Sequence, residues 1–308
     1  MSPHSAVAAA VGRALETEHR PLDFEVPAGA CDCHVHVFGP YDRFPLSPDR
    51  LYMPGPAPLA GLIAHQQALG LERVVIVQPS VYGTDNSCML DALYRFGPRT
   101  RGIAVVDANI SHNALRQLHE AGVCGIRLNL ETAGVTDLHT ARRRIQKVAA
   151  QAAPYGWHIQ IYADISVIAA LQDVIRDLPV TVVFDHFARV KARRGPDQPE
   201  FAPLLSLVHL GKAYVKLSAP RRISDLPDYR DVGAIAGALL QANPERLLWG
   251  SDWPHPGARP GSARDPDHIE PFYPDDDGLV LNRLNSWMGS ADVMRQILVE
   301  NPARLYGF

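Results

Sequence analysis

The stretch Ala30–Pro40 reads ACDCHVHVFGP, and it decides between the two α/β architectures open to a chain of this length. It is a mostly apolar run that ends in a glycine and a proline. An open doubly wound sheet would carry a glycine-rich phosphate loop after its first strand. Residues 34–40 contain no such loop. The stretch therefore favours a closed barrel of parallel strands.

Seven further short runs rich in valine and isoleucine follow, and segments with apolar residues at helical spacing lie between several of them. Strands that are apolar on both faces and alternate with helices are typical of a parallel sheet covered by helices. Eight such units predict a (β/α)8 TIM barrel. The eight expected strands are Ala30–Phe38, Arg73–Gln78, Arg101–Asp107, Gly122–Leu130, Trp157–Ala163, Val180–His186, Ala213–Ser218 and Arg246–Ser251.

The length of 308 residues fits such a barrel as a single domain. We expect an N-terminal arm over residues 1–27, helical in part, and the barrel over residues 28–308. Two connections, Gly39–Pro58 and Trp253–Asp277, are longer than the usual range of about 2–6 residues. Long loops after barrel strands are candidates for a substrate lid.

The composition excludes several classes of protein. Thirty basic and 33 acidic residues give a net charge of −3, so no basic stripe for nucleic acid is expected. No window holds 18 uninterrupted apolar residues, and the first residues lack a basic signal-peptide region, which predicts no membrane span and a cytoplasmic location. Four cysteines are too few for a disulfide framework, and Cys31 and Cys33 are expected to be buried free thiols.

Polar residues at the ends of apolar strands are the candidates for chemistry. His34 and His36 are two residues apart, so both side chains lie on one face of the first strand. They can form half of a metal site or polarise a substrate oxygen. His186 ends the sixth strand, Asp252 follows the eighth, and Arg127 stands among apolar residues of the fourth. Each alone has an ordinary structural explanation, but together at strand ends they predict a catalytic centre.

These positions resemble the amidohydrolase superfamily, which carries an H-x-H motif on strand one, a histidine on strand six and an aspartate on strand eight. Within it, the chain resembles the branch of 2-pyrone-4,6-dicarboxylate lactonases and related 4-sulfomuconolactone hydrolases over residues 28–308. The matching segments include Cys31–Phe38, Val77–Ser80, Gly83–Asn86, Gly125–Asn129, Phe184–Phe187, Val215–Ser218 with Arg222, Trp249–His255 and Asn301–Leu305. The resemblance implies an enzyme that opens the ring of a small anionic lactone during the breakdown of aromatic compounds, without an organic cofactor.

Two departures from the superfamily pattern bear on metal and substrate. Many members hold two metal ions with a lysine on strand four and a histidine on strand five, where this chain has Arg127 and Tyr162. We therefore expect either no metal, as the pyrone lactonase resemblance implies, or one Zn²⁺ held by His34, His36, His186 and Asp252. Where the pyrone branch carries a further basic residue, this chain reads Glu131-Thr132-Ala133. One anchor for a substrate carboxylate is then either missing or supplied by Arg221, and 4-sulfomuconolactone or a sugar-acid lactone becomes a realistic substrate.

Lactone opening needs a water nucleophile, a base and stabilisation of the oxyanion. We assign the base to Asp252 and polarisation of the carbonyl to the histidine cluster or its metal ion. Arg127 and Arg222 are expected to hold a substrate carboxylate or sulfonate. Neutral hydrogen bonds are assigned to Ser80, Tyr52 and Tyr162.

Two other functions stay open at this stage. One is a zinc-dependent decarboxylase of the same superfamily, which would use the same four ligands. The other is a catalytically inactive barrel kept as a binding protein, which would be expected to lose the polar groups at the mouth. The expected partner is a small anionic lactone, without nucleic acid or membrane, and a homo-oligomer is left open.

Overall fold

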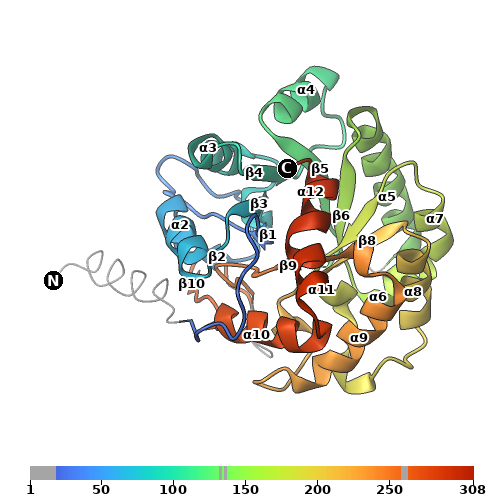
Figure 1. Cartoon of the computed structure of the whole chain (residues 1–308). Helices are drawn as coiled ribbons and strands as arrows, with labels where there is room; N and C mark the ends of the chain where they lie inside the picture. Colours follow the sequence, from blue (N-terminus) through green and yellow to red (C-terminus); the bar gives the residue numbers. More distant parts are fainter. Residues whose placement is uncertain (1–18, 132–133, 135–136, 258–262) are drawn as a thin grey trace.

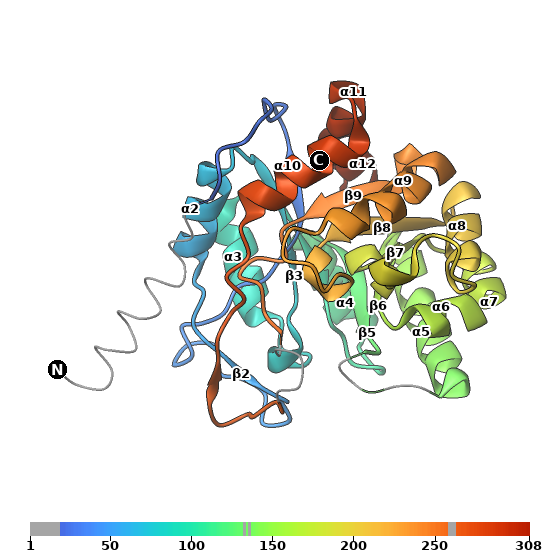
Figure 2. The same ribbon diagram turned by 90° about the horizontal axis from the view of Figure 1, so that it is seen from below.

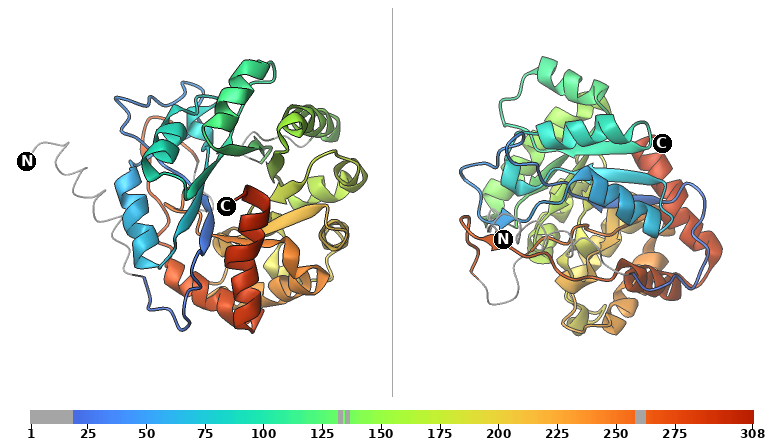
Figure 3. Two further views of the ribbon diagram at one scale, coloured as in Figure 1. Left: turned by 45° about the horizontal axis from the view of Figure 1, so that its top comes forward. Right: turned by 90° about the vertical axis from the view of Figure 1, so that its left-hand side faces the viewer.

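Eight parallel strands form a barrel and pair in sequence order in the computed structural model, which describes residues 19–131, 134, 137–257 and 263–308. Helices surround the strands on the outside (Figures 1 and 3). The (β/α)8 prediction is confirmed, and each expected strand overlaps an observed one. The strands are β1 (Cys31–Val35), β3 (Arg73–Val77), β4 (Thr100–Ala104), β5 (Val123–Asn129), β6 (His158–Tyr162), β7 (Val182–Phe184), β8 (Ala213–Ser218) and β9 (Leu247–Gly250).

The barrel closes through main-chain hydrogen bonds between the end of β1 and the residues just after β9. The Asp252 N–H donates to the carbonyl of His34 at 2.9 Å, and the His36 N–H donates to the carbonyl of Trp253 at 2.8 Å. This closure places the first and last barrel segments side by side. The candidate residue Asp252 is thereby brought to His34 and His36, although more than 200 residues separate it from them in sequence.

The helices bury one face against the barrel. In α5 (Leu138–Ala152), the buried side chains are Ala141, Ile145, Ala149 and Ala152, which recur at helical spacing. The Asp137 carboxylate caps this helix by accepting from the backbone N–H groups of His139 and Thr140. The other helices are α2 (Leu59–Ala68), α3 (Ser87–Phe96), α4 (His112–Glu120), α6 (Ile165–Ala170), α7 (Gln172–Arg176), α8 (Phe201–His209), α9 (Gly233–Ala242), α10 (Asp277–Met288), α11 (Ala291–Arg295) and α12 (Asn301–Tyr306).

The two long connections meet in a small sheet of their own. β2 (Met53–Pro54) pairs in parallel with β10 (Ile269–Glu270). Figure 2 shows β2 on the side of the molecule opposite α11. This pairing shows that the two loops contact one another. It does not test whether they form a lid, which stays a prediction.

Two sequence predictions concern the ends of the chain and the membrane. Residues 1–18, most of the expected arm, lie outside the described part of the chain, and the division at residue 28 stays a prediction. Among the described residues, the structure contains no helix with the length and apolar character needed to cross a membrane.

Candidate active site

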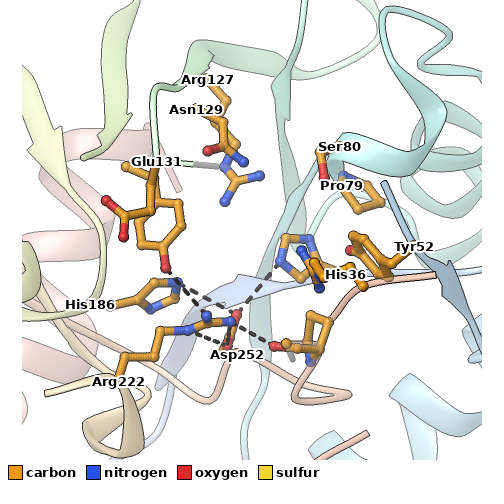
Figure 4. A pocket seen from close by; sticks show the side chains of 14 residues that line it. His36, Tyr52, Pro79, Ser80, Arg127, Asn129, Glu131, His186, Arg222 and Asp252 are labelled. Carbon is orange, nitrogen blue, oxygen red and sulfur yellow. Dashed lines mark hydrogen bonds and ion pairs between the residues drawn. The ribbon is translucent and has the colours of Figure 1, made fainter. Parts of the chain in front are cut away.

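The carboxyl ends of the barrel strands surround a cavity of about 700 Å³, its open mouth included. Barrels of this type hold their catalytic residues at this end. Side chains from several strands and from the loops that follow them point into the cavity (Figure 4). All the candidate residues except His34 line it, namely His36, Tyr52, Ser80, Arg127, Tyr162, His186, Arg222 and Asp252.

Asp252 lies between the histidines in an uncommon backbone conformation. Its φ is 66°, in the left-handed region that few residues other than glycine adopt. Such conformations persist where the surrounding structure fixes them, and they cluster at functional sites. Gly250, two residues earlier, runs so close to β1 that a Cβ there would lie 2.7 Å from Cβ of His34. Only a glycine lets β9 pack this closely on the first histidine.

One oxygen of the Asp252 carboxylate is held by two arginines. Oδ2 accepts from Nη2 of Arg222 at 2.9 Å and from Nη2 of Arg221. Burial alone would raise the pKa of Asp252, but Arg222, His186 and Arg221 hold it well below its ordinary value. The carboxylate is therefore ionised at neutral pH.

The other oxygen, Oδ1, faces three imidazole rings. Nε2 of His34 and Nε2 of His36 each lie 3.6 Å from it, and Nε2 of His186 lies 3.7 Å away. These side chains are almost completely buried. Neither His34 Nε2 nor Asp252 Oδ1 has a hydrogen-bond partner among the described residues. Buried polar atoms are nearly always bonded, so these atoms require an explanation.

The far nitrogen of the His36 ring fixes the protonation of its near nitrogen. Nδ1 of His36 lies 2.7 Å from the carbonyl of Val77 and must donate to it, since a carbonyl only accepts. Nδ1 of His34 lies 3.2 Å from Oδ1 of Asp185 and 3.4 Å from Nζ of Lys216, which can only donate, so its contacts do not assign its proton to one nitrogen. Burial lowers the pKa of His34 to about 3 and also lowers that of His36, so both rings are neutral. The Nε2 lone pair of His36 then faces the Asp252 carboxylate.

Lone pairs that face a carboxylate oxygen repel it unless a cation lies between them. Three imidazoles and one carboxylate are donors that Zn²⁺ commonly takes, and ligand atoms around a tetrahedral ion lie about 3.3 Å apart. The distances of 3.6–3.7 Å are close to this value. The outer nitrogens are supported by Asp185, the Val77 carbonyl and the Ser218 hydroxyl, as in many metal sites. His34, His36, His186 and Asp252 therefore fit a single metal ion.

Asp185 and Lys216 form a second charged layer beneath the cavity. Nζ of Lys216 donates to Oε1 of Gln160 at 2.7 Å and lies 3.8 Å from Oδ1 of Asp185. Nε of Arg127 lies 3.5 Å from Oδ2 of Asp185. Two cationic side chains thus neutralise Asp185 from both sides. These two positive charges disfavour a second divalent cation beside Asp185, and the number of metal ions stays a prediction.

The structure assigns partners to the arginines that the sequence proposed for substrate binding. Arg127 lines the cavity and contacts Asp185. Arg222 lines it as well, but its guanidinium also binds Asp252, the Pro256 carbonyl and the Tyr162 hydroxyl. Arg221 pairs with Asp252 and Asp275 and is absent from the cavity lining. The proposal that Arg221 replaces a missing substrate anchor therefore does not fit its position.

Two charged cavity residues carried no assigned role in the sequence. Arg264 comes from the long loop after β9, stacks 3.8 Å above the Tyr52 ring and pairs with Glu270 of β10 at 2.6 Å. Glu131 follows β5 and pairs with Arg189 at 3.0 Å. No periodic pattern in the sequence could place Arg264 in the cavity, because its loop is held there by the pairing of β2 with β10. Glu131 lies only two residues beyond the end of β5, so its nearness to the strand end was the available signal.

A (β/α)8 barrel with three histidines and an aspartate at the carboxyl ends of its strands is the arrangement of the amidohydrolases. The family model for amidohydrolases matches residues 31–308. The chain therefore belongs to the amidohydrolase family.

Within this family, several of the similar proteins are named as lactone hydrolases. A 2-pyrone-4,6-dicarboxylate hydrolase of Comamonas testosteroni is 38% identical over 293 residues, covering 92% of each chain. A 4-sulfomuconolactone hydrolase of Hydrogenophaga intermedia is 34% identical, covering 93% of this chain and 91% of its own. Among solved structures, a probable 2-pyrone-4,6-dicarboxylic acid hydrolase of Acinetobacter baumannii with bound citric acid has a TM-score of 0.76 at 27% identity, covering 91% of this chain and all of its own.

Proposed function

We propose that the protein hydrolyses a small anionic lactone of the 2-pyrone-4,6-dicarboxylate or muconolactone type, during the breakdown of aromatic compounds. The observation that carries this proposal is the pair of environments around Asp252. Oδ2 is fixed by two arginines, and Oδ1 faces the imidazoles at the floor of a cavity that also holds cationic side chains. The names of relatives that cover over nine-tenths of the chain support the same activity.

Substrate binding is assigned to the arginines at the cavity wall. Arg127, Arg222 and Arg264 line the cavity and present guanidinium groups to an anion. Each of these guanidinium groups also has a carboxylate partner, namely Asp185, Asp252 or Glu270, so the positive charge of the cavity wall is partly balanced before an anion binds. Ser80, Tyr52 and Tyr162 add neutral hydrogen-bonding groups from the surrounding wall. These contacts would orient the lactone carbonyl toward Asp252.

Asp252 acts as the base in the proposed reaction. Its Oδ1 accepts a proton from water as the water oxygen forms a bond to the lactone carbonyl carbon. The bond between that carbon and the ring oxygen then breaks, and the ring oxygen takes the proton back from Asp252. The new carboxylic acid ionises, so each ring opening releases one proton to solvent.

A metal ion would be held by Nε2 of His34, His36 and His186 and by Oδ1 of Asp252. When bound, Zn²⁺ supplies a Lewis acid for the carbonyl oxygen and lowers the pKa of a water molecule. The neutral ring of His36 carries its proton on Nδ1, which donates to the Val77 carbonyl. This ring therefore cannot donate a hydrogen bond to the lactone carbonyl, and the role proposed for it is to hold a cation.

The test is a pH-indicator assay of the purified protein against 2-pyrone-4,6-dicarboxylate, 4-sulfomuconolactone and a sugar-acid lactone. Each lactone is measured before and after dialysis against a chelator and after Zn²⁺ is restored. We expect proton release with at least one of the first two lactones, and none with the Asp252→Asn variant. Release of CO₂ without ring opening would support the decarboxylase instead. Substrate binding without turnover under every condition would support the inactive barrel.

A further inference from the structure

A second group of buried histidines and a carboxylate lies on the outer side of β1, apart from the cavity. We call it the His65 cluster, and it comprises His19, His65, His255 and Asp277. The four residues come from four segments, namely the start of the described chain, α2, the loop after β9 and the first turn of α10. Their side chains are between 1% and 7% exposed. None of them lines the cavity at the barrel mouth.

One ligand atom from each of His19, His65 and Asp277 can be chosen so that all three lie within 4.8 Å of one another. Nε2 of His19 lies 3.2 Å from Nδ1 of His65. Ligand atoms of a tetrahedral zinc ion are separated by about 3.3 Å, because each lies about 2.0–2.1 Å from the metal. The facing nitrogens of the two rings are thus spaced as two ligands of one ion would be.

Other atoms of the cluster lack hydrogen-bond partners among the described residues. They are Nδ1 of His19, Nε2 of His65 and Oδ1 of Asp277, whereas Oδ2 of Asp277 pairs with His255. Nε2 of His255 is the nearest cation-forming atom to the carboxylate, 2.9 Å from its Oδ2. So many unpartnered polar atoms in one buried place are unusual in a native fold and indicate a missing ligand.

A metal ion can replace the hydrogen bond that joins the two rings. In the metal-free protein one of the facing nitrogens, 3.2 Å apart, donates to the other. Metal binding displaces protons from histidine ligands, so an ion held by both nitrogens would take the place of this hydrogen bond.

With an ion in this place, Nδ1 of His19 would still face the carboxylate of Asp276, 3.9 Å away, which is the usual second layer around a metal-bound histidine.

We propose that His19, His65 and Asp277 bind a divalent metal ion of the zinc class, with His255 orienting the Asp277 carboxylate. Two imidazoles and one carboxylate suit Zn²⁺ and its neighbours in the first transition row. The ion would tie the segment around residue 19 to α2 and α10. It would also support the loop that follows Asp252, because the His65 ring packs 5.9 Å from Trp253 and Asp277 holds His255.

The experiment measures zinc per chain after the full-length protein has been equilibrated with Zn²⁺ and freed of loose metal by gel filtration. Four variants are compared with the parent protein, namely His65→Gln, Asp277→Asn, His36→Gln and His209→Gln. His209 lies at the exposed end of α8, away from both histidine groups, and is the matched control. We expect His65→Gln and Asp277→Asn each to lose one zinc equivalent per chain while His209→Gln loses none. Combining Asp277→Asn with His36→Gln separates this loss from any loss at the barrel centre.

Zinc-dependent thermal stability gives an independent readout. Added Zn²⁺ should raise the Tm of the parent and of His36→Gln. The part of this increase in Tm that comes from binding at the His65 cluster should be lost in Asp277→Asn. If Asp277→Asn or His65→Gln folds poorly, His19→Gln tests the same site from the edge of the fold. Zinc content that is equal in the parent, His19→Gln and every foldable cluster variant would overturn the proposal and leave a proton-linked histidine network in its place.

Discussion

Arg222 donates to Oδ2 of Asp252 at 2.9 Å and leaves Oδ1 of the same carboxylate facing the imidazoles of the barrel floor. The arginine therefore has two roles in the proposed reaction. It lines the cavity where a substrate anion would bind, and it fixes the rotation of the carboxylate that accepts the proton. A base that is held in this way is oriented before the substrate arrives, which reduces the reorganisation needed in the transition state.

Replacing Asp252 by asparagine should remove turnover and retain substrate binding. The amide is of similar size, but it cannot accept the proton of the attacking water. Loss of a general base typically costs about 10²- to 10⁴-fold in rate, and we expect kcat to fall by this amount with little change in KM. Circular dichroism and Tm would confirm that the variant folds. A kcat close to that of the parent would remove Asp252 from the mechanism.

Replacing Arg222 by methionine should weaken the binding of an anionic lactone more than that of an uncharged lactone with the same ring. A hydrogen bond to a charged group contributes about 1.5–3 kcal/mol, which corresponds to roughly 10- to 100-fold in KM. Because Arg222 also holds Asp252, kcat should fall for both lactones. Arg127→Met tests the opposite wall of the cavity. Equal losses in KM on charged and uncharged lactones would show that these arginines are structural only.

Arg264 and Glu270 offer a pair of variants with opposite expected effects. Arg264→Met removes a guanidinium from the cavity wall, and we expect KM for an anionic lactone to rise about tenfold with kcat unchanged. Glu270→Gln removes the negative partner of Arg264 at 2.6 Å, so KM should stay the same or fall. Steady-state kinetics on both variants distinguish anion binding by Arg264 from a disturbance of the loop that carries it. If the loop were disturbed, both substitutions would raise KM.

The free energy of unfolding should decrease as the pH is lowered, because of His158, a buried residue of β6. Burial lowers its pKa from 6.5 to about 3 in the folded chain. Between these two values the unfolded chain binds a proton that the folded chain does not, so stability is lost as pH falls below 6.5. The contribution is on the order of 1 kcal/mol per pH unit. Urea unfolding of the parent and of His158→Gln should therefore give pH slopes that differ by one proton, and parallel curves would contradict the assignment.

The barrel itself could be predicted from the sequence because its signal is local and repeated. Each strand is a short run of apolar residues, and the parallel pairing follows from the alternation with helices. His34 and His36 could be placed at the mouth from strand direction and from their spacing of two, but the register shift of β1 between Asp32 and Val35 has no local signal. The left-handed backbone at Asp252 and the close contact of Gly250 with His34 depend on barrel closure and have no local signal.

The electrostatic partners of the site could not be predicted in the same way. Lys216 and Asp185 lie in apolar strands or at their ends, and each is an isolated charge in the sequence, yet they meet Arg127 in one buried group. Arg264 reaches the cavity only through the pairing of two loops. Oδ2 of Asp252 accepts hydrogen bonds from both Arg221 and Arg222, so these two side chains point toward the same atom. Adjacent residues of an extended chain point to opposite sides, so this arrangement could not be predicted from the sequence.

The most direct test of the account is a single turnover in water enriched with ¹⁸O, followed by mass spectrometry of the product and a measurement of released protons. The account states that water attacks the lactone carbonyl and that the ring oxygen leaves. It predicts one ¹⁸O atom in the new carboxylate of the product and one proton released for each ring opened. Conversion of the lactone without ¹⁸O incorporation and without proton release would show an isomerisation or a decarboxylation, and would contradict the proposed hydrolysis.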